Sequence, residues 1–215
     1  MAAFVAVAAA SAITGCAVLG YVGTNLMPEK VKAAYEMEQR PTIVVVDDPS
    51  GFLDDRGLVH KIAHGIGREL IDHKALKQVL PGTALVQMAA RLGDEYARLP
   101  IDQIGTTLGA QQVLHVNIES VNVSQMQVIL ECRAKVIDAQ RGSRLFPPTG
   151  TGGPPASARN GGLVRAEWNY QPVTELGAGA RAELNRDLAR RVSVEVARLF
   201  YDHELPKRSE AFSPS

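Results

Sequence analysis

Two histidines at helical spacing are the first residues whose types could do chemistry. His60 and His64 lie four residues apart in a segment whose apolar residues recur at helical intervals, so both fall on one helix face. Two histidines at this spacing can bind one zinc ion, with a third ligand from His73 or a distant carboxylate. The metalloprotease pattern requires Glu directly after the first histidine, where this chain has Lys61. Solvated surface histidines are therefore the favoured interpretation, and no metal is predicted.

An acidic pair follows the most apolar run of the chain. Asp47 and Asp48 come directly after the run from Thr42 to Val46, a position where α/β enzymes often place groups that bind a ligand. The sequence Asp-Pro-Ser-Gly that begins at Asp48 is also ordinary turn chemistry, in which the carboxylate accepts hydrogen bonds from nearby amides. We favour the turn. A hydrolase or metal enzyme that uses Asp47, Asp48 and the histidines is kept as an alternative.

The remaining candidate groups carry weaker signals. The glycine-rich run 150–153 lacks the Lys-Ser/Thr ending of a phosphate-binding loop and does not open a predicted helix. Cys132 falls on the apolar face of a predicted strand, which favours a buried, inert thiol over a nucleophile. The preceding predicted strand carries polar residues on one face that could line a binding surface, namely His115, Asn117 and Glu119. The sequence therefore predicts no catalytic residue and no cofactor.

The composition narrows the class of protein. Lys plus Arg and Asp plus Glu both number 23 in 215 residues, and this balance lacks the positive excess of a nucleic-acid-binding protein. Hydrophobic residues make up 46% of the chain, as in a globular protein of one domain or one domain with a tail. Cys16 and Cys132 are too few for a disulfide scaffold or a four-cysteine metal site.

The amino terminus predicts a membrane anchor. No charged side chain precedes Glu29, and the run from Met1 to Met27 is long enough to span a bilayer, which needs about 20 apolar residues. Residues 1–28 are therefore assigned to a signal or anchor. Within them, Ile13-Thr14-Gly15-Cys16 resembles a bacterial lipobox, and this resemblance implies lipidation of Cys16. An uncleaved transmembrane helix and a buried helix are the alternatives.

Hydrophobic periodicity outlines a single α/β domain over residues 41–203. The pattern predicts a mixed sheet of about five strands, helices packed mainly on one face of it, and a long carboxy-terminal helix. The predicted strands span residues 42–46, 75–80, 113–123, 126–136 and 164–170, the first of them central in the sheet. The predicted helices span residues 56–72, 85–99, 101–108 and 178–202. We expect a linker at residues 29–40, a flexible Gly/Pro-rich loop at residues 146–162, and a disordered tail at residues 204–215.

One segment carries a family resemblance. In residues 101–114 a predicted helix runs into Leu108-Gly109-Ala110 and then into an apolar strand. This segment is similar to the corresponding part of the TolB amino-terminal domain, of the curli-secretion lipoprotein CsgG, and of the lipoprotein activators of penicillin-binding proteins. The resemblance implies an envelope lipoprotein with a compact α/β domain and implies no catalytic residues. Under the sorting convention of some bacteria, Ala17 after the lipidated cysteine favours the periplasmic face of the outer membrane.

These features predict an envelope lipoprotein that binds a protein partner and catalyses no reaction. We expect the partner to dock on the exposed sheet face, which carries Gln127, Glu131 and Arg133, or on the loop at residues 146–162. The lipid or the amino-terminal helix would contact the membrane, and no nucleic acid is expected. A structural subunit of an envelope complex is an alternative, with the carboxy-terminal helix as the contact of a homo-oligomer.

Overall fold

The computed structural model describes residues 30–53, 55–124, 127–148, 161–169 and 178–205. The chain divides into two compact units. The smaller unit takes residues from both ends of the chain, and its described part is a two-stranded antiparallel ribbon of β1 (Lys30–Val31) and β7 (His203–Glu204). The larger unit, Ala33–Tyr201, contains the other described elements. Of the predicted tail, residues 206–215 lie outside the described residues.

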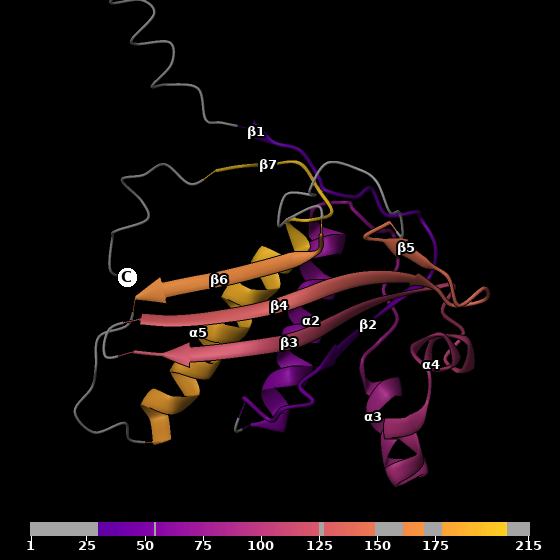
Figure 1. Ribbon diagram of the computed structural model, residues 1–215, viewed down its shortest axis with the longest axis horizontal. Helices are drawn as coiled ribbons and strands as arrows, with labels where there is room; N and C mark the ends of the chain where they lie inside the picture. The colour runs from indigo at the N-terminus through magenta and orange to yellow at the C-terminus, as the bar shows by residue number, and fades with distance from the viewer. Residues whose placement is uncertain (1–29, 54, 125–126, 149–160, 170–177, 206–215) are drawn as a thin grey trace, which may run out of the picture. The chain divides into compact units, whose positions relative to one another are not determined.

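A five-stranded mixed sheet runs through the larger unit (Figure 1). Its strands are β2 (Thr42–Asp47), β3 (Gln112–Val123), β4 (Gln127–Asp138), β5 (Arg144–Phe146) and β6 (Leu163–Asn169). β2 is parallel to β3, β3 is antiparallel to β4, and β5 and β6 both pair with β4 in antiparallel orientation. Along β4 each even-numbered residue is buried and each odd-numbered residue is half-buried, as its alternating sequence predicted. The mixed α/β class is confirmed.

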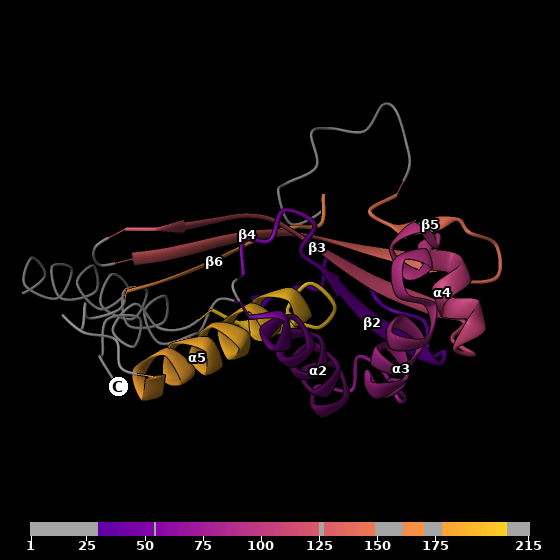
Figure 2. The same cartoon turned by 90° about the horizontal axis from the view of Figure 1, so that it is seen from below.

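Two long helices cover one face of the sheet. α2 (Arg56–Asp72) begins after Asp55, whose carboxylate accepts a hydrogen bond from the Gly57 N–H at 2.8 Å. α5 (Ala178–Ala197) packs beside α2, and both lie beneath the sheet in Figure 2. One apolar cluster joins the helices to the strands, and it includes Ile62 and Ile66 of α2, Val192 and Val196 of α5, and Leu114, Val116, Leu130, Cys132 and Ala134 of β3 and β4.

A second group of helices packs against the other face beside β2. It consists of α3 (Thr83–Leu92), the 3-10 helix η1 (Gly93–Arg98) and α4 (Ile101–Thr107). A separate apolar cluster holds this group in place, with Ile43, Val45 and Val113 of the strands against Leu85, Met88 and Ile104 of the helices. Gly109 follows α4 with a φ of +76°, the left-handed conformation that commonly ends a helix, and β3 then begins at Gln112. The predicted order of helix, Leu-Gly-Ala and strand in residues 101–114 is confirmed.

β2 lies at the edge of the sheet, so its predicted central position was wrong. The strand is apolar on both faces because helices cover both of them: Val44 and Val46 belong to the cluster of α2, and Val45 belongs to that of α3. The predicted strand at residues 75–80 was also wrong. It is reduced to one parallel bridge between Val79 and Thr42.

The segment before β2 packs on the domain. Met37 is buried, and Tyr35 stacks on Phe146 with 5.4 Å between ring centroids. The N–H groups of Ala34 and Tyr35 donate to the carbonyl oxygen of Leu199 at 2.7 and 3.1 Å. These residues fall in the range that the sequence analysis assigned to a linker, and they contribute to the larger cluster of the core. The strand β5 was not predicted, and residues 149–160 of the predicted loop lie outside the described residues.

A buried carboxylate ends β4. One oxygen of Asp138 accepts the N–H groups of Arg141 at 2.9 Å and Gln140 at 3.0 Å, and the other lies 3.2 Å from Nη1 of Arg40. The Arg141 N–H is the main cause that lowers the pKa of Asp138. Burial opposes this effect, while the Gln140 N–H and the Arg40 guanidinium add to it.

Acid is therefore expected to weaken the fold through Asp138. Because its pKa is lowered from the ordinary value of 3.8, the folded state binds this proton less readily than the unfolded chain does. The stabilisation is present above pH 3.8 and is lost as the pH falls through that value toward the lowered pKa. Asp138→Asn should lower the free energy of unfolding at neutral pH by about 1 kcal/mol and should flatten its decline in acid. Urea unfolding of both proteins over a range of pH measures this, and equally steep declines would contradict it.

Candidate functional site

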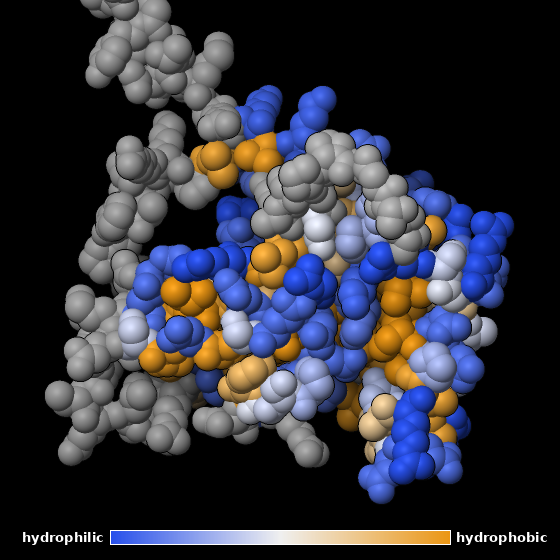
Figure 3. All heavy atoms as spheres, in the orientation of Figure 1, coloured by the Kyte–Doolittle hydropathy of each residue, from blue (hydrophilic) through white to orange (hydrophobic). Residues whose placement is uncertain are grey.

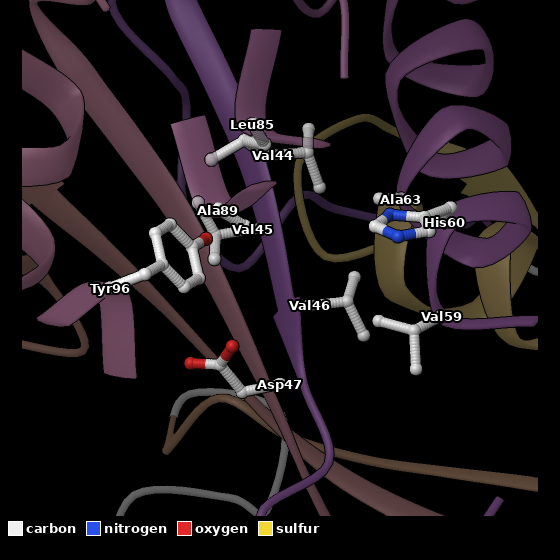
Figure 4. Close-up of a pocket in the computed structure, with 10 residues that line it drawn as sticks. All are labelled: Val44, Val45, Val46, Asp47, Val59, His60, Ala63, Leu85, Ala89 and Tyr96. Atoms are coloured by element: carbon white, nitrogen blue, oxygen red, sulfur yellow. The ribbon is translucent and has the colours of Figure 1, made fainter. Parts of the chain in front are cut away.

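A cavity of about 110 Å³ lies along the outer edge of β2 (Figure 4). Its floor is the strand from Val44 to Asp47. One wall comes from α2 and the other from α3 and η1, with Val59, His60 and Ala63 on the first and Leu85, Ala89 and Tyr96 on the second. We call this cavity the edge groove.

Along the edge groove, the outward backbone groups of β2 have no partner among the described residues. The Thr42 N–H donates outward to the Gln78 carbonyl at 3.4 Å, and the Thr42 carbonyl accepts the Leu80 N–H at 2.7 Å. Since alternate residues of a strand turn their amides to the same side, the N–H and C=O groups of Val44 and Val46 also point outward. Within the described part of the chain, no group bonds to them there. Yet Val44 and Val46 are only 3% and 7% exposed, and buried backbone groups are normally paired.

A proline explains why this edge stays open. Residues 78–80 pair with Thr42 as a parallel strand would, but Pro81 has no N–H with which to continue the pairing. The chain then leaves the sheet edge and enters α3 at Thr83. The edge groove lies where a parallel strand would have continued past Leu80, and it begins where the chain's own pairing with β2 stops.

The edge groove is apolar along its length and polar at one end. Asp47 closes the floor with its side chain 43% exposed, and its Oδ2 lies 2.8 Å from Nε2 of His115 on β3. Burial is the main cause that raises the pKa of Tyr96, and the nearby charge of Asp47 raises it further. In Figure 4, Asp47 and Tyr96 lie on the side of η1, and His60 lies across the floor on α2.

The structure brings some of the predicted site residues together and separates others. Asp47 and His60 line the same cavity. Asp48 does not, because its carboxylate accepts the N–H groups of Phe52 at 2.9 Å and Leu53 at 2.7 Å, as the turn hypothesis predicted. His64 is exposed on α2, and His73 stacks on Tyr201 with 4.0 Å between ring centroids. The described residues contain no cluster of three or more His, Cys, Asp or Glu side chains that could hold a metal ion.

Comparisons with known proteins give low similarity. No family model and no curated protein matches the sequence significantly. Among solved structures, lipoprotein GNA1162 from Neisseria meningitidis is 10% identical with a TM-score of 0.38, over 71% of this chain and 94% of that chain. A PelC dodecamer from Paraburkholderia phytofirmans is 9% identical with a TM-score of 0.40, over 81% of this chain and 98% of that chain. The hypothetical protein CT253 from Chlamydia trachomatis is 14% identical with a TM-score of 0.38, over 73% and 98% of the respective chains.

The sheet face that was predicted to dock a partner neutralises much of its own charge. Arg133 forms two hydrogen bonds with Glu119, at 2.6 and 3.1 Å, next to a β-bulge that turns both Glu119 and Ser120 toward this face. Arg165 lies 3.3 Å from Glu167 and 4.0 Å from Glu131. Figure 3 shows mostly hydrophilic side chains over the middle of β3 and β4. This face is polar, but its ion pairs leave fewer free charges for a partner than the sequence indicated.

The two cysteines and the glycine-rich run are the remaining candidates from the sequence. Cys132 is fully buried, and burial raises the pKa of its thiol to about 12, which keeps it in the unreactive protonated form. Cys16 and the glycine-rich run 150–153 lie outside the described residues. Within the described ranges, no helix is both long and apolar enough to cross a membrane.

Sequence reasoning missed most of the edge groove. Tyr96 falls inside the helix predicted over residues 85–99, and Ala63 and Ala89 carry no chemical signal by type. The unpaired groups of Val44 and Val46 belong to the backbone, which every residue shares. The one available signal was Pro81, directly after a segment with strand character.

Proposed function

We propose that this domain is a protein-binding module that is anchored in the bacterial envelope and catalyses no reaction. The observation that carries the proposal is the open edge of β2, where the buried backbone of Val44 and Val46 lacks partners between two helical walls. An unpaired strand edge is a ready template for another chain. Proteins usually cover, charge or shorten such edges, and this one is reached through a cavity instead.

Photo-crosslinking in cells tests whether a protein occupies the edge groove. The photoreactive amino acid benzoylphenylalanine replaces either His60, whose exposed side chain lines the edge groove, or Gln140, an exposed residue in the turn after β4. We expect a discrete protein adduct from position 60 and none from position 140. No adduct from either position, or the same adduct from both, would contradict the proposal.

The envelope anchor is the second part of the proposal. The lipobox-like Ile13-Thr14-Gly15-Cys16 supports lipidation of Cys16, and Ala17 supports the outer membrane. A single acyl chain binds membranes only marginally, whereas several chains give a stable anchor. The mature amino-terminal peptide should therefore begin at Cys16 and carry acyl chains in its mass spectrum. In Cys16→Ser the acylated peptide should disappear, and an unchanged spectrum would contradict lipidation at this residue.

A hydrolase remains the second candidate because one observation favours it. The Asp47 carboxylate orients His115 at 2.8 Å, which is how a general base is commonly held. However, the residues that line the edge groove include no Ser, Thr or Cys that could act as a nucleophile. Hydrolysis of model esters or phosphoesters by the full chain, lost in both Asp47→Asn and His115→Gln, would replace our proposal with this one.

A structural subunit held together by the carboxy-terminal helix has less support. The apolar stripe of α5 is used inside the domain, where Leu188, Val192 and Val196 are buried in the larger apolar cluster. The side chains that α5 leaves more accessible are largely charged, and several pair with each other, as Arg190 does with Asp187 at 3.0 Å. Over residues 182–197, this helix therefore has little apolar surface left for a second copy.

A further inference from the structure

We infer that the occupant of the edge groove is an extended, basic peptide segment of the protein partner, added to the sheet as a strand beside β2. This inference rests on the proposed function and names the chemistry of the partner. Its observations are the unpaired backbone of Val44 and Val46, the shape of the two walls, and the charge at the end of the floor.

The backbone groups identify an extended peptide as the occupant. Val44 and Val46 are two residues apart on one strand, so their outward N–H and C=O groups repeat about every 7 Å along the groove. The main chain of a second strand has the same repeat, so its N–H and C=O groups can bond both groups of each valine, from one peptide residue in antiparallel pairing or from two alternate residues in parallel pairing. Residues 78–80 already use the neighbouring position, Thr42, in this way.

The walls determine which side chains fit. Side chains of an added strand point alternately to its two faces, so one would contact Val59 and Ala63 of α2 and the next Leu85 and Ala89 of α3. The small Ala63 and Ala89 leave the space between the helices open. Apolar side chains of moderate size, such as Val or Ile, would fill this space and bury apolar surface.

The charge at the end of the floor selects a basic peptide. Asp47 ends β2 and lines the groove with its side chain 43% exposed, and its ion-pair contact within the described residues is with His115 of β3, at 2.8 Å. The groove lining contains no Lys or Arg, and His60 faces the groove from α2. A Lys or Arg of the peptide near Asp47 would be attracted, and a Glu there would be repelled.

β2 of a second copy fits this chemistry less well. A twofold axis would pair the two β2 strands in antiparallel orientation, and this strand, Thr42–Asp47, contains no Lys or Arg, so the copy's strand would bring no positive charge to Asp47. Its outward groups at Thr42 are already bonded by residues 78–80. A dimer through the edge groove is therefore an outcome that would overturn the inference.

A displayed library of random linear peptides, selected against the full chain in detergent, tests the inference. We expect enriched peptides that have consecutive apolar residues in the paired part, because both walls are apolar, that carry Lys or Arg near one end, and that lack Pro in the paired part. A synthetic copy of the best peptide should lose about tenfold or more in affinity when the amides that would pair with β2 are N-methylated, because methylation removes those donors and leaves the side chains.

Three variants of the chain locate the binding site. Ala89→Trp fills the edge groove and should abolish binding, while Val86→Trp on the same helix, 44% exposed and outside the groove lining, should leave the Kd unchanged. Asp47→Lys should lower the affinity for the Lys-containing peptide about tenfold or more. A peptide with Glu in place of that Lys should bind the Asp47→Lys variant with the original affinity. The charge exchange needs no bulky residue in the core, so it tests the inference even if Ala89→Trp does not fold.

The outcomes separate this inference from the proposed function. Four outcomes would each overturn the inference that the occupant is an extended peptide. They are the absence of an enriched peptide, binding that Ala89→Trp leaves unchanged, binding that N-methylation leaves unchanged, and a dimer that Ala89→Trp dissociates. If position 60 still gives a protein adduct in cells, the protein-binding function stands and the partner presents a folded surface. If both experiments fail, both proposals fail.

Discussion

Replacing Gly162 with alanine is expected to lower the free energy of unfolding by about 3 kcal/mol. Gly162 precedes β6 with a φ of +74°, a backbone conformation that side chains with a Cβ atom rarely adopt. A Cβ atom there would lie 2.2 Å from the carbonyl oxygen of Ala134 on β4. That oxygen belongs to the backbone of a paired strand, so it cannot move aside without disturbing the sheet. The hydrogen bond from the Ala134 N–H to the Gly162 carbonyl, 2.8 Å long, would be disturbed as well.

Gly109→Ala is the matched control for this prediction. Gly109 has nearly the same φ, +76°, but a Cβ atom at this position would meet nothing within 4 Å. Its substitution should cost only the backbone strain, about 1 kcal/mol. Urea unfolding of the two variants and the parent chain gives both values. Equal losses would mean that the contact with Ala134 relaxes at no cost, and this would contradict the prediction for Gly162.

The elements that the sequence predicted well are those whose signals are local. The bounds of α2 follow from the cap at Asp55 and from apolar residues repeated at helical spacing, and they match the prediction. β4 follows from strict alternation, because one face of the strand meets a buried core and the other does not, and β3 alternates in the same way from Leu114 to Glu119, before its bulge. For these elements the neighbours along the chain carry enough information to fix the structure.

The position of β2 could not be predicted in the same way. An apolar run reports that both faces of a strand are covered, and α2 and α3 do cover both faces of β2. It does not report whether both edges are paired, since edge pairing uses backbone groups that every residue has. Full coverage of both faces is therefore compatible with an edge strand as well as with the central strand that the apolar run predicted. Only the three-dimensional structure shows that the chain at Pro81 abandons the pairing that Val79 begins.

The candidate site was predicted in part for a related reason. Asp47 and His60 were singled out as carriers of chemistry, and both line the edge groove. They were first considered as metal ligands or catalytic groups, because those are the roles that such residue types suggest. The groove depends more on unpaired amides and on the small side chains of Ala63 and Ala89, and neither feature indicates a function when only the sequence is known. A binding edge is therefore harder to predict from sequence than a metal site.

Gly65→Ala is expected to destabilise the domain by about 2 kcal/mol, although alanine is the better helix former by about 1 kcal/mol. Gly65 lies where α2 and α5 pack together, and a Cβ atom there would stand 2.3 Å from Oγ and 2.9 Å from Cβ of Ser193. The Ser193 hydroxyl is buried and donates to the Ile62 carbonyl at 3.0 Å, so it cannot turn away without losing that bond. The overpacking and the lost hydrogen bond together exceed the gain in helix propensity.

A double-mutant cycle with Ser193→Gly tests this directly, because that change removes both atoms which the new methyl group would meet. The double variant should be more stable than the sum of the two single changes by about 2 kcal/mol. Gly67→Ala is the control on the same helix, since the contact of its new Cβ at 3.0 Å is with a side-chain methyl group of Val79. Additive effects in the cycle would contradict a close contact between these helices.

Because α2 also forms one wall of the edge groove, Gly65→Ala should weaken groove binding and Ser193→Gly should restore it in the double variant.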